Sequence, residues 1–202
     1  ALSGKKILFV ATKKQAKGLV AEAAEALNMP YITERWPGGL LTNFATIRKS
    51  IKKMQIIDKM KENGTFDSLS KRERLQIDRQ RAKLDLNLGS IVKMTRMPEA
   101  VFIVDTNKEN IALAEANKLG IRSFAMNDTN TNPSLVNFPI PANDDASKSI
   151  ECIMSLVKTA IAEGLEERGA EQDAKAVEKK EKAKKIAEKA SEKQEAPKKE
   201  DK

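Results

Sequence analysis

The chain has 202 residues, enough for one domain with appendages, and 37 Lys and Arg against 29 Asp and Glu give it a formal net charge of +8. One Cys and no His exclude an intrachain disulfide and a multi-Cys metal site, and remove the usual general base. No apolar run approaches the roughly 20 residues that a membrane span needs and no signal peptide is visible, so we expect a cytoplasmic chain without a membrane partner.

Short apolar segments alternate with amphipathic ones along most of the chain. The segment Lys6-Ile7-Leu8-Phe9-Val10-Ala11 is typical of a buried parallel strand, and Gly120 is placed to end a helix. Strands alternating with helices predict a parallel α/β sheet with right-handed crossovers. The expected strands are 6–11, 30–33, 100–105, 121–126 and a short one within 134–141, and the expected helices are 15–27, 107–119 and 146–163.

The segment 40–92 interrupts this alternation because it contains no strand candidate. Apolar residues recur at steps of three and four within 44–54 and again within 77–91, on the two sides of a polar turn at 61–67. This pattern predicts an inserted antiparallel helical hairpin of the coiled-coil type.

Three regions follow from these patterns. We expect a discontinuous sheet domain formed by 1–39 plus 93–165, the hairpin insertion at 40–92, and a tail at 166–202. Ala, Lys and Glu dominate the tail, so we expect it to be disordered or transiently helical. Ser70 and Glu73 have the spacing of a capping box for the second hairpin helix.

Positive charge is concentrated on the hairpin and its exit. Residues 45–96 hold fourteen Lys and Arg against six Asp and Glu, an excess of eight that equals the net charge of the whole chain. A solvated helical face would carry Glu in similar number, so the excess favours contact with a polyanion, namely nucleic-acid phosphates. The candidate phosphate-binding residues here are Arg48, Lys49, Lys52, Lys71, Arg72, Arg74, Lys93 and Arg96.

The first strand-to-helix turn offers a second basic group. Lys13, Lys14 and Lys17 flank a helix N-terminus, whose exposed N–H groups and dipole favour an anion; the alternative is a capped helix with solvated lysines. Neither a dinucleotide fingerprint nor a phosphate loop is present, because the only glycine of this turn, Gly18, falls inside the helix.

Other polar residues lie at the predicted ends of strands. Arg35, Thr42 and Asn43 are candidate RNA contacts, whereas the single Trp, Trp36, is more typical of a packing anchor.

Carboxylates also gather at predicted strand ends. Asp105, Asp128, Asp144 and Asp145 could bind magnesium, but no nucleophile, base or phosphate cradle accompanies them, so we predict caps and loops rather than a catalytic or metal site. Thr106 and Glu109 have the spacing of a capping box.

Four clusters carry a family resemblance over about residues 5–164. They are Arg35-Trp36-Pro37-Gly38-Gly39 with 41–44, then 98–105, 118–121 and 141–146. Together they resemble the family of the second protein of the small ribosomal subunit, bacterial type.

The resemblance implies a Rossmann- or flavodoxin-like parallel sheet with a protruding helical hairpin. It further implies a structural constituent of the small subunit that binds small-subunit ribosomal RNA, supports subunit assembly and translation, and is not an enzyme. The expected location is ribosome-bound in the cytoplasm, and no cofactor or small-molecule substrate is expected. Neighbouring subunit proteins, including the large first protein of the subunit, are the protein partners that the resemblance implies.

Two departures from the family pattern accompany the match. Family members usually carry several dozen residues ahead of the first strand, whereas the sequence begins at Ala1; we expect either a truncated chain or a start that the sequence omits. A loop that often reads Asp-Thr-Asn-Cys-Asp-Pro has Thr131 and Asn132 in place of its Cys and second Asp, which weakens a metal-binding interpretation.

The residues leave two other functions to compare. One is a nucleotide-dependent α/β enzyme, which would need the missing phosphate loop. The other is a coiled-coil adaptor for another protein, which would favour apolar or mixed-charge outer faces on the hairpin.

Overall fold

The computed structural model describes residues 3–194, with side chains described for residues 3–170. The chain divides into two units, Lys5–Ile161 and a second unit formed by Ala1–Gly4 with Ala162–Lys202. In the second unit Gly4 has φ +76° and lies directly against the guanidinium of Arg168. No helix in the described part of the chain is long and apolar enough to cross a membrane.

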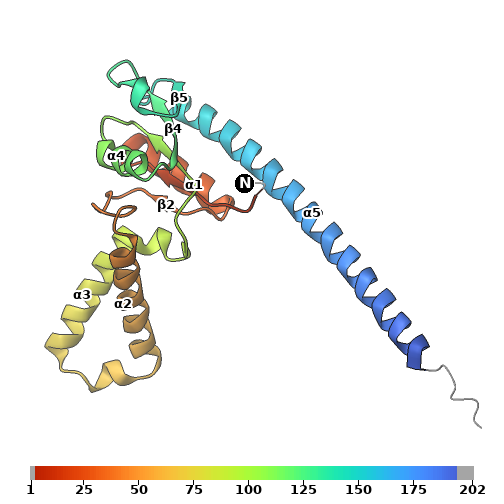
Figure 1. Ribbon diagram of the computed structural model, residues 1–202. Coiled ribbons are helices and arrows are strands. Elements are labelled where there is room, and N and C mark those ends of the chain that lie inside the picture. The colour runs from red at the N-terminus through yellow and green to blue at the C-terminus, as the bar shows by residue number, and fades with distance from the viewer. Residues whose placement is uncertain (1–2, 195–202) are drawn as a thin grey trace, which may run out of the picture. The chain divides into compact units, whose positions relative to one another are not determined.

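A five-stranded parallel sheet forms the centre of the first unit (Figure 1). Its order is β2-β1-β3-β4-β5, the order of flavodoxin-like sheets. β3 is buried along its whole length, which explains its unbroken apolar sequence. The strands are β1 (Ile7–Val10), β2 (Tyr31–Ile32), β3 (Ala100–Val104), β4 (Arg122–Asn127) and β5 (Phe138–Pro141), each pairing in parallel with its neighbour. The predicted parallel α/β class is therefore confirmed.

Alternate residues of each central strand face opposite sides of the sheet. Leu8 and Val10 join the core on one side, together with Val101 and Ile103, while Phe9 contacts Phe102 on the other side at a ring-centroid distance of 5.6 Å.

Helices cover both faces of the sheet. The connection from β1 leads towards one edge and that from β3 towards the other, so right-handed crossovers place their helices on opposite faces. Apolar side chains of the second crossover, Leu113 and Ala116 among them, pack into the core cluster with the base of the hairpin. The helices are α1 (Lys14–Ala26), α4 (Asn110–Lys118) and α5 (Ser147–Gln194), of which α5 runs through both units.

Two helices are inserted between β2 and β3, where the sequence predicts the hairpin. They are α2 (Phe44–Glu62) and α3 (Lys71–Leu88), joined through the short helix η1 (Thr65–Ser68) and followed by η2 (Gly89–Ile91). Ion pairs join the two helices, at 2.8 Å from Arg81 Nε to Asp58 Oδ1 and at 2.6 Å from Lys61 Nζ to Asp78 Oδ1. The coiled-coil description stays a prediction.

The ends of two helices test the predicted caps. The Ser70 hydroxyl accepts from the Glu73 N–H and the Glu73 carboxylate accepts from the Ser70 N–H, so this capping box is confirmed. Gly120 has φ +66° just after α4, as a glycine that ends a helix should.

The capping box predicted at Thr106 and Glu109 is wrong. Asp105, at φ +68°, accepts instead from the N–H groups of Asn107 and Lys108, so the chain turns before α4 begins. Glu109 is buried and accepts from the hydroxyl of Thr12. A partner 97 residues away thus replaced the expected local one.

The predicted domain bounds stay a prediction. Helix α5 continues as far as Gln194 and so covers most of the sequence expected to form the tail. Residues 195–202 of that expected tail lie outside the described residues.

Candidate nucleic-acid interface

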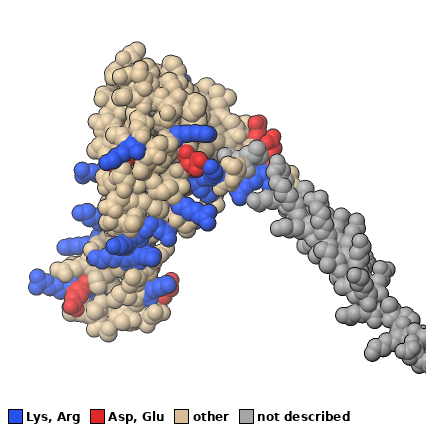
Figure 2. All heavy atoms as spheres, in the orientation of Figure 1, with Lys and Arg blue, Asp and Glu red and all other residues tan. Residues whose placement is uncertain are grey.

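Basic side chains gather on the hairpin (Figure 2), and most of those within 45–96 form no ion pair. Within 45–96, all described, only Lys61, Arg74 and Arg81 of the fourteen Lys and Arg form ion pairs, which leaves eleven. Four of the six carboxylates are taken up by those three residues, and Glu73 lies in the capping box. We call the exposed, unpaired residues the hairpin surface: Lys49, Lys52, Lys53, Lys59, Lys71, Arg72, Arg79, Lys83, Lys93 and Arg96.

Two further candidates are partly engaged within the hairpin. Arg48 is half-buried and donates from Nη1 to the carbonyl oxygen of Met94 at 3.2 Å, so it ties α2 to the hairpin exit. Arg74 Nη1 lies 3.6 Å from Asp67 Oδ1. Both charges therefore help to hold the hairpin as well as contributing to its potential.

The three lysines at the start of α1 differ from one another. Lys14 is exposed. Lys17 Nζ lies 3.1 Å from Glu34 Oε2 in an exposed pair. Lys13, by contrast, is only 14% exposed and points towards the loops at the carboxyl ends of the strands.

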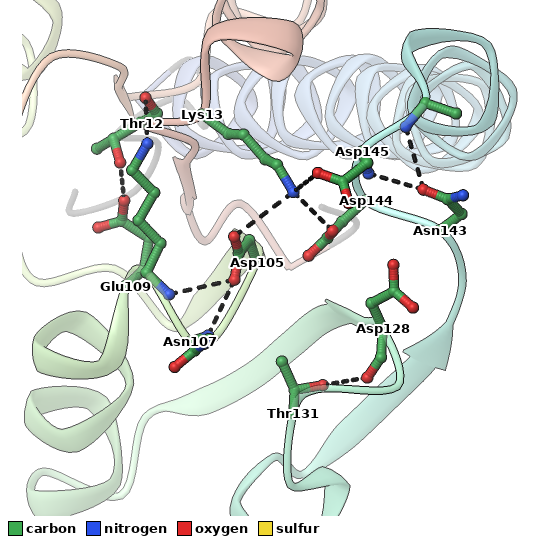
Figure 3. Close-up of polar contacts among 12 residues, drawn as sticks. Thr12, Lys13, Asp105, Asn107, Glu109, Asp128, Thr131, Asn143, Asp144 and Asp145 are labelled. Atoms are coloured by element: carbon green, nitrogen blue, oxygen red, sulfur yellow. Dashed lines mark hydrogen bonds and ion pairs between the residues drawn. The ribbon is translucent and has the colours of Figure 1, made fainter.

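Lys13 is surrounded by carboxylates from two other loops (Figure 3). Its Nζ lies 2.7 Å from Asp144, 2.6 Å from Asp145 and 3.6 Å from Asp105. Burial alone would lower the pKa of Lys13, but hydrogen bonds to Asp144 and Asp145 raise it above its ordinary value. The structure therefore gives Lys13 intramolecular partners in the position where the sequence predicts a phosphate.

Carboxylates considered for magnesium lie at the same carboxyl ends of the strands. Ligand oxygens of Asp128, Asp144 and Asp145 lie within 4.8 Å of one another, and this is the group in the described chain spaced to hold a metal ion. Lys13 already supplies a counter-charge to Asp144 and Asp145.

Glu115 on α4 organises the loop that leads into the hairpin, and sequence reasoning missed it. Its Oε1 accepts from Trp36 Nε1 at 3.0 Å and from the Gly39 N–H at 2.7 Å. Its Oε2 accepts from the Leu41 N–H at 2.9 Å and from the N–H and hydroxyl of Thr42 at 3.1 and 3.2 Å. Its partners lie more than 70 residues away in the chain, so no local pattern marks it.

These hydrogen bonds decide the charge state of Glu115. Burial would raise the pKa of this carboxyl, but the donors from Trp36, Thr42, Gly39 and Leu41 outweigh burial and lower the pKa. Trp36 itself is 6% exposed and belongs to the core cluster, so its predicted packing role is confirmed.

The loop candidates for RNA contact lie on either side of this arrangement. Arg35 and Asn43 are exposed. Asn43 precedes α2 and accepts from the Thr46 hydroxyl at 2.8 Å. The Thr42 hydroxyl donates to Glu115, so it supports the loop rather than pointing freely to solvent.

Comparison with known proteins decides the family. The model of the family described as ribosomal protein S2 matches residues 1–164. The chain belongs to the ribosomal protein S2 family.

Bacterial relatives named small ribosomal subunit protein uS2 agree with this assignment. The chain is 66% identical to that of Flavobacterium johnsoniae over 178 residues, 88% of this chain and 70% of the relative. It is 65% identical to that of Phocaeicola vulgatus over 172 residues, and 64% identical to that of Flavobacterium psychrophilum over 174 residues. These matches cover 85% and 86% of this chain but only 62% and 65% of those relatives.

Family membership confirms the resemblance drawn from the four sequence clusters. Ribosomal protein S2 is a structural, non-catalytic component of the small subunit, so the prediction of a ribosomal protein rather than an enzyme is confirmed. The predicted ribosome-bound location in the cytoplasm follows from the same membership.

Proposed function

We propose that this chain helps to build the small ribosomal subunit by binding subunit ribosomal RNA through its hairpin surface. The observation that carries the proposal is the separation of charges on the hairpin. Eleven Lys and Arg have no ion pair, while four of the six carboxylates are matched within the hairpin. Unmatched cations on a projecting element are available to phosphates without first breaking an internal pair.

Phosphate contact gives this binding a characteristic salt dependence. Each neutralised phosphate releases condensed counterions, which contributes roughly −0.7 to −0.9 to the slope of log affinity against log salt. The contact is largely independent of sequence, which suits a protein positioned on a folded RNA.

The loop around the hairpin base extends the proposed surface. Arg35, Asn43 and Lys14 are exposed near strand ends and helix starts, and we include them as contacts. We leave Lys13 out because three carboxylates already surround it, and we assign Thr42 a supporting role.

Protein partners form the second part of the proposal. Neighbouring small-subunit proteins, including the large first protein of the subunit, are the partners that family membership suggests. The hairpin itself exposes basic faces, and their charge is complementary to RNA phosphates rather than to a protein surface that has few carboxylates.

Charge reversal on two surfaces tests the RNA assignment. The variant Lys49→Glu with Lys52→Glu and Arg72→Glu should lower affinity for small-subunit RNA and flatten its salt slope, because repelled phosphates no longer release counterions. The matched control is Lys118→Glu with Arg122→Glu and Lys148→Glu, which reverses three exposed cations outside the hairpin. Each set changes the net charge from +8 to +2, since each reversal removes two charges.

Filter binding against salt concentration separates the outcomes. A loss confined to the hairpin variant supports the proposal. Equal losses in both variants would mean that total charge, not the hairpin surface, governs binding, and would overturn it.

A further inference from the structure

Glu115 is a buried carboxylate whose five hydrogen bonds all come from one loop. It is 8% exposed, and its donors belong to Trp36, Gly39, Leu41 and Thr42. Three of those donors are backbone N–H groups that would otherwise need other partners. Because one rigid helix supplies both oxygens, the carboxylate fixes the path of the loop rather than a single side chain.

That loop ends where the hairpin begins. Gly39 has φ +82°, a conformation that favours glycine, and its carbonyl oxygen accepts from the Asn43 N–H at 2.7 Å. Asn43 is the residue directly before α2. The position of the carboxylate is therefore passed through two hydrogen bonds to the first turn of the hairpin.

The side chains proposed to contact RNA flank the fixed segment. Arg35 precedes Trp36, and Asn43 follows Thr42. Lys49 and Lys52 lie further along α2. A small change of direction at the start of a helix grows along its length, so the first turn decides where these charges lie.

We propose that Glu115 is a positioning residue for RNA binding, whose carboxylate holds residues 36–42 so that Arg35, Asn43 and the hairpin surface meet RNA together. The inference rests on the proposed RNA-binding function. Glu115 itself is buried, so its effect would reach RNA through the loop rather than by direct contact. Without it, the loop would have to be ordered at the moment of binding, and the entropy of that ordering would be subtracted from the affinity.

The substitution Glu115→Gln tests the proposal because its effect on charge and its effect on the loop would change RNA affinity in opposite directions. Glutamine keeps the shape, but its amide NH2 faces N–H donors that the carboxylate accepted. The change raises the net charge from +8 to +9, which by charge alone would strengthen RNA binding. We expect affinity for small-subunit RNA to fall instead, by about tenfold.

Glu99→Gln is the matched control. Its side chain is 52% exposed and pairs with Lys5 at the surface, so it makes the same charge change without touching the loop. Its RNA affinity should equal or slightly exceed that of wild type.

The fluorescence of the single Trp reports on the loop in the folded protein, independently of a change in global stability. In Glu115→Gln one acceptor oxygen faces the donors that two carboxylate oxygens served, so the loop that carries Trp36 should loosen whichever way the amide is oriented. The fluorescence of Trp36 should therefore become more accessible to acrylamide in the folded protein, whereas Glu99→Gln should leave it unchanged. Circular dichroism at the assay temperature confirms that each variant is folded.

The outcomes are distinct. Weaker binding together with a more accessible Trp36 supports the inference. Unchanged or tighter binding by folded Glu115→Gln overturns it, as does weaker binding with Trp36 unchanged.

If Glu115→Gln does not fold, the variant Thr42→Val is tested instead, because it removes only the hydroxyl donor to Glu115. We expect this variant to bind RNA more weakly, and unchanged binding would overturn the inference. Failure of the wild type to bind RNA with salt dependence would instead reject the proposed function.

Discussion

Two charges of opposite sign, the partly buried Lys13 and the buried Glu115, hold the ends of the parallel strands and the hairpin base in place. Lys13 joins loops that follow β1, β3 and β5, and Glu115 joins α4 to the loop after β2. Each charge is matched by several partners, which offsets the free energy of removing it from water. Removing Lys13 would leave Asp144 and Asp145 without their cation, and removing Glu115 would leave the N–H groups of the loop without their acceptor.

Lys13→Met should lower the free energy of unfolding by about 3 kcal/mol, because Asp144 is almost fully buried and would lose its cation. The pKa of Lys13 is raised in the folded state, so its contribution is complete below the ordinary lysine pKa and is lost only as pH rises through the raised value. The difference from wild type should therefore stay constant from about pH 6 to about pH 9 in urea titrations. Lys14→Met, at an exposed position, should change stability by less than about 0.5 kcal/mol; an equal cost would contradict the internal role of Lys13.

Glu115→Gln should destabilise the fold by about 1–3 kcal/mol at neutral pH. The pKa of Glu115 is lowered in the folded state, so its contribution is present above the unfolded pKa of about 4.3 and is lost as pH falls through the folded value. The stability gap between wild type and variant should therefore be constant above about pH 5 and narrow as the solution becomes more acidic. A gap that widens with acid would show that another group controls this loop.

At the scale of elements, local chemistry and distant contacts decide different helix starts. Ser70 begins α3 through its own capping box, three residues from its partner. The turn before α4 is set instead by Asp105, while Glu109 is drawn to Thr12. A cap can be read from sequence only where no distant partner competes for it.

Ser70→Ala should cost about 1 kcal/mol of stability, since the Glu73 N–H loses its acceptor. Faster hydrogen exchange in the first turn of α3, with the sheet amides unchanged, would locate the effect. Ser68→Ala is the control, because the Ser68 hydroxyl donates to the Thr65 carbonyl in η1 and leaves the α3 cap intact. Similar exchange changes in both variants would argue against the cap as the cause.

At the scale of the whole molecule, net charge hides an uneven distribution. Residues 45–96 carry fourteen basic and six acidic residues, whereas 171–202 carry eleven Lys against nine Asp and Glu. Mixed charge attracts phosphates weakly because neighbouring carboxylates cancel the field. The hairpin should therefore dominate association with RNA.

Deleting 171–202 should change RNA affinity by less than threefold (about 0.6 kcal/mol), while the triple reversal at Lys49, Lys52 and Arg72 should reduce it by more than about tenfold. Filter binding measures both affinities, and subunit occupancy by mass spectrometry, in strains that express each variant as the only copy, measures the consequence for assembly. If subunits lacked the deletion variant but contained the hairpin variant at normal occupancy, the assignment of RNA contact to the hairpin would be wrong.

The sequence by itself determined the strands, the inserted helical pair, the concentration of charge on it and the family, because these depend on local periodicity, composition and short motifs. Only the tertiary structure decided which charges are available. Lys13 and Lys14 are adjacent in the chain, yet one is enclosed by Asp105, Asp144 and Asp145 and the other is exposed. Glu115 likewise looks like any helical glutamate until folding brings the loop of Trp36 against it. Parallel strands bring their carboxyl ends together from distant parts of the chain, so the partners of a charge there are set by topology rather than by spacing.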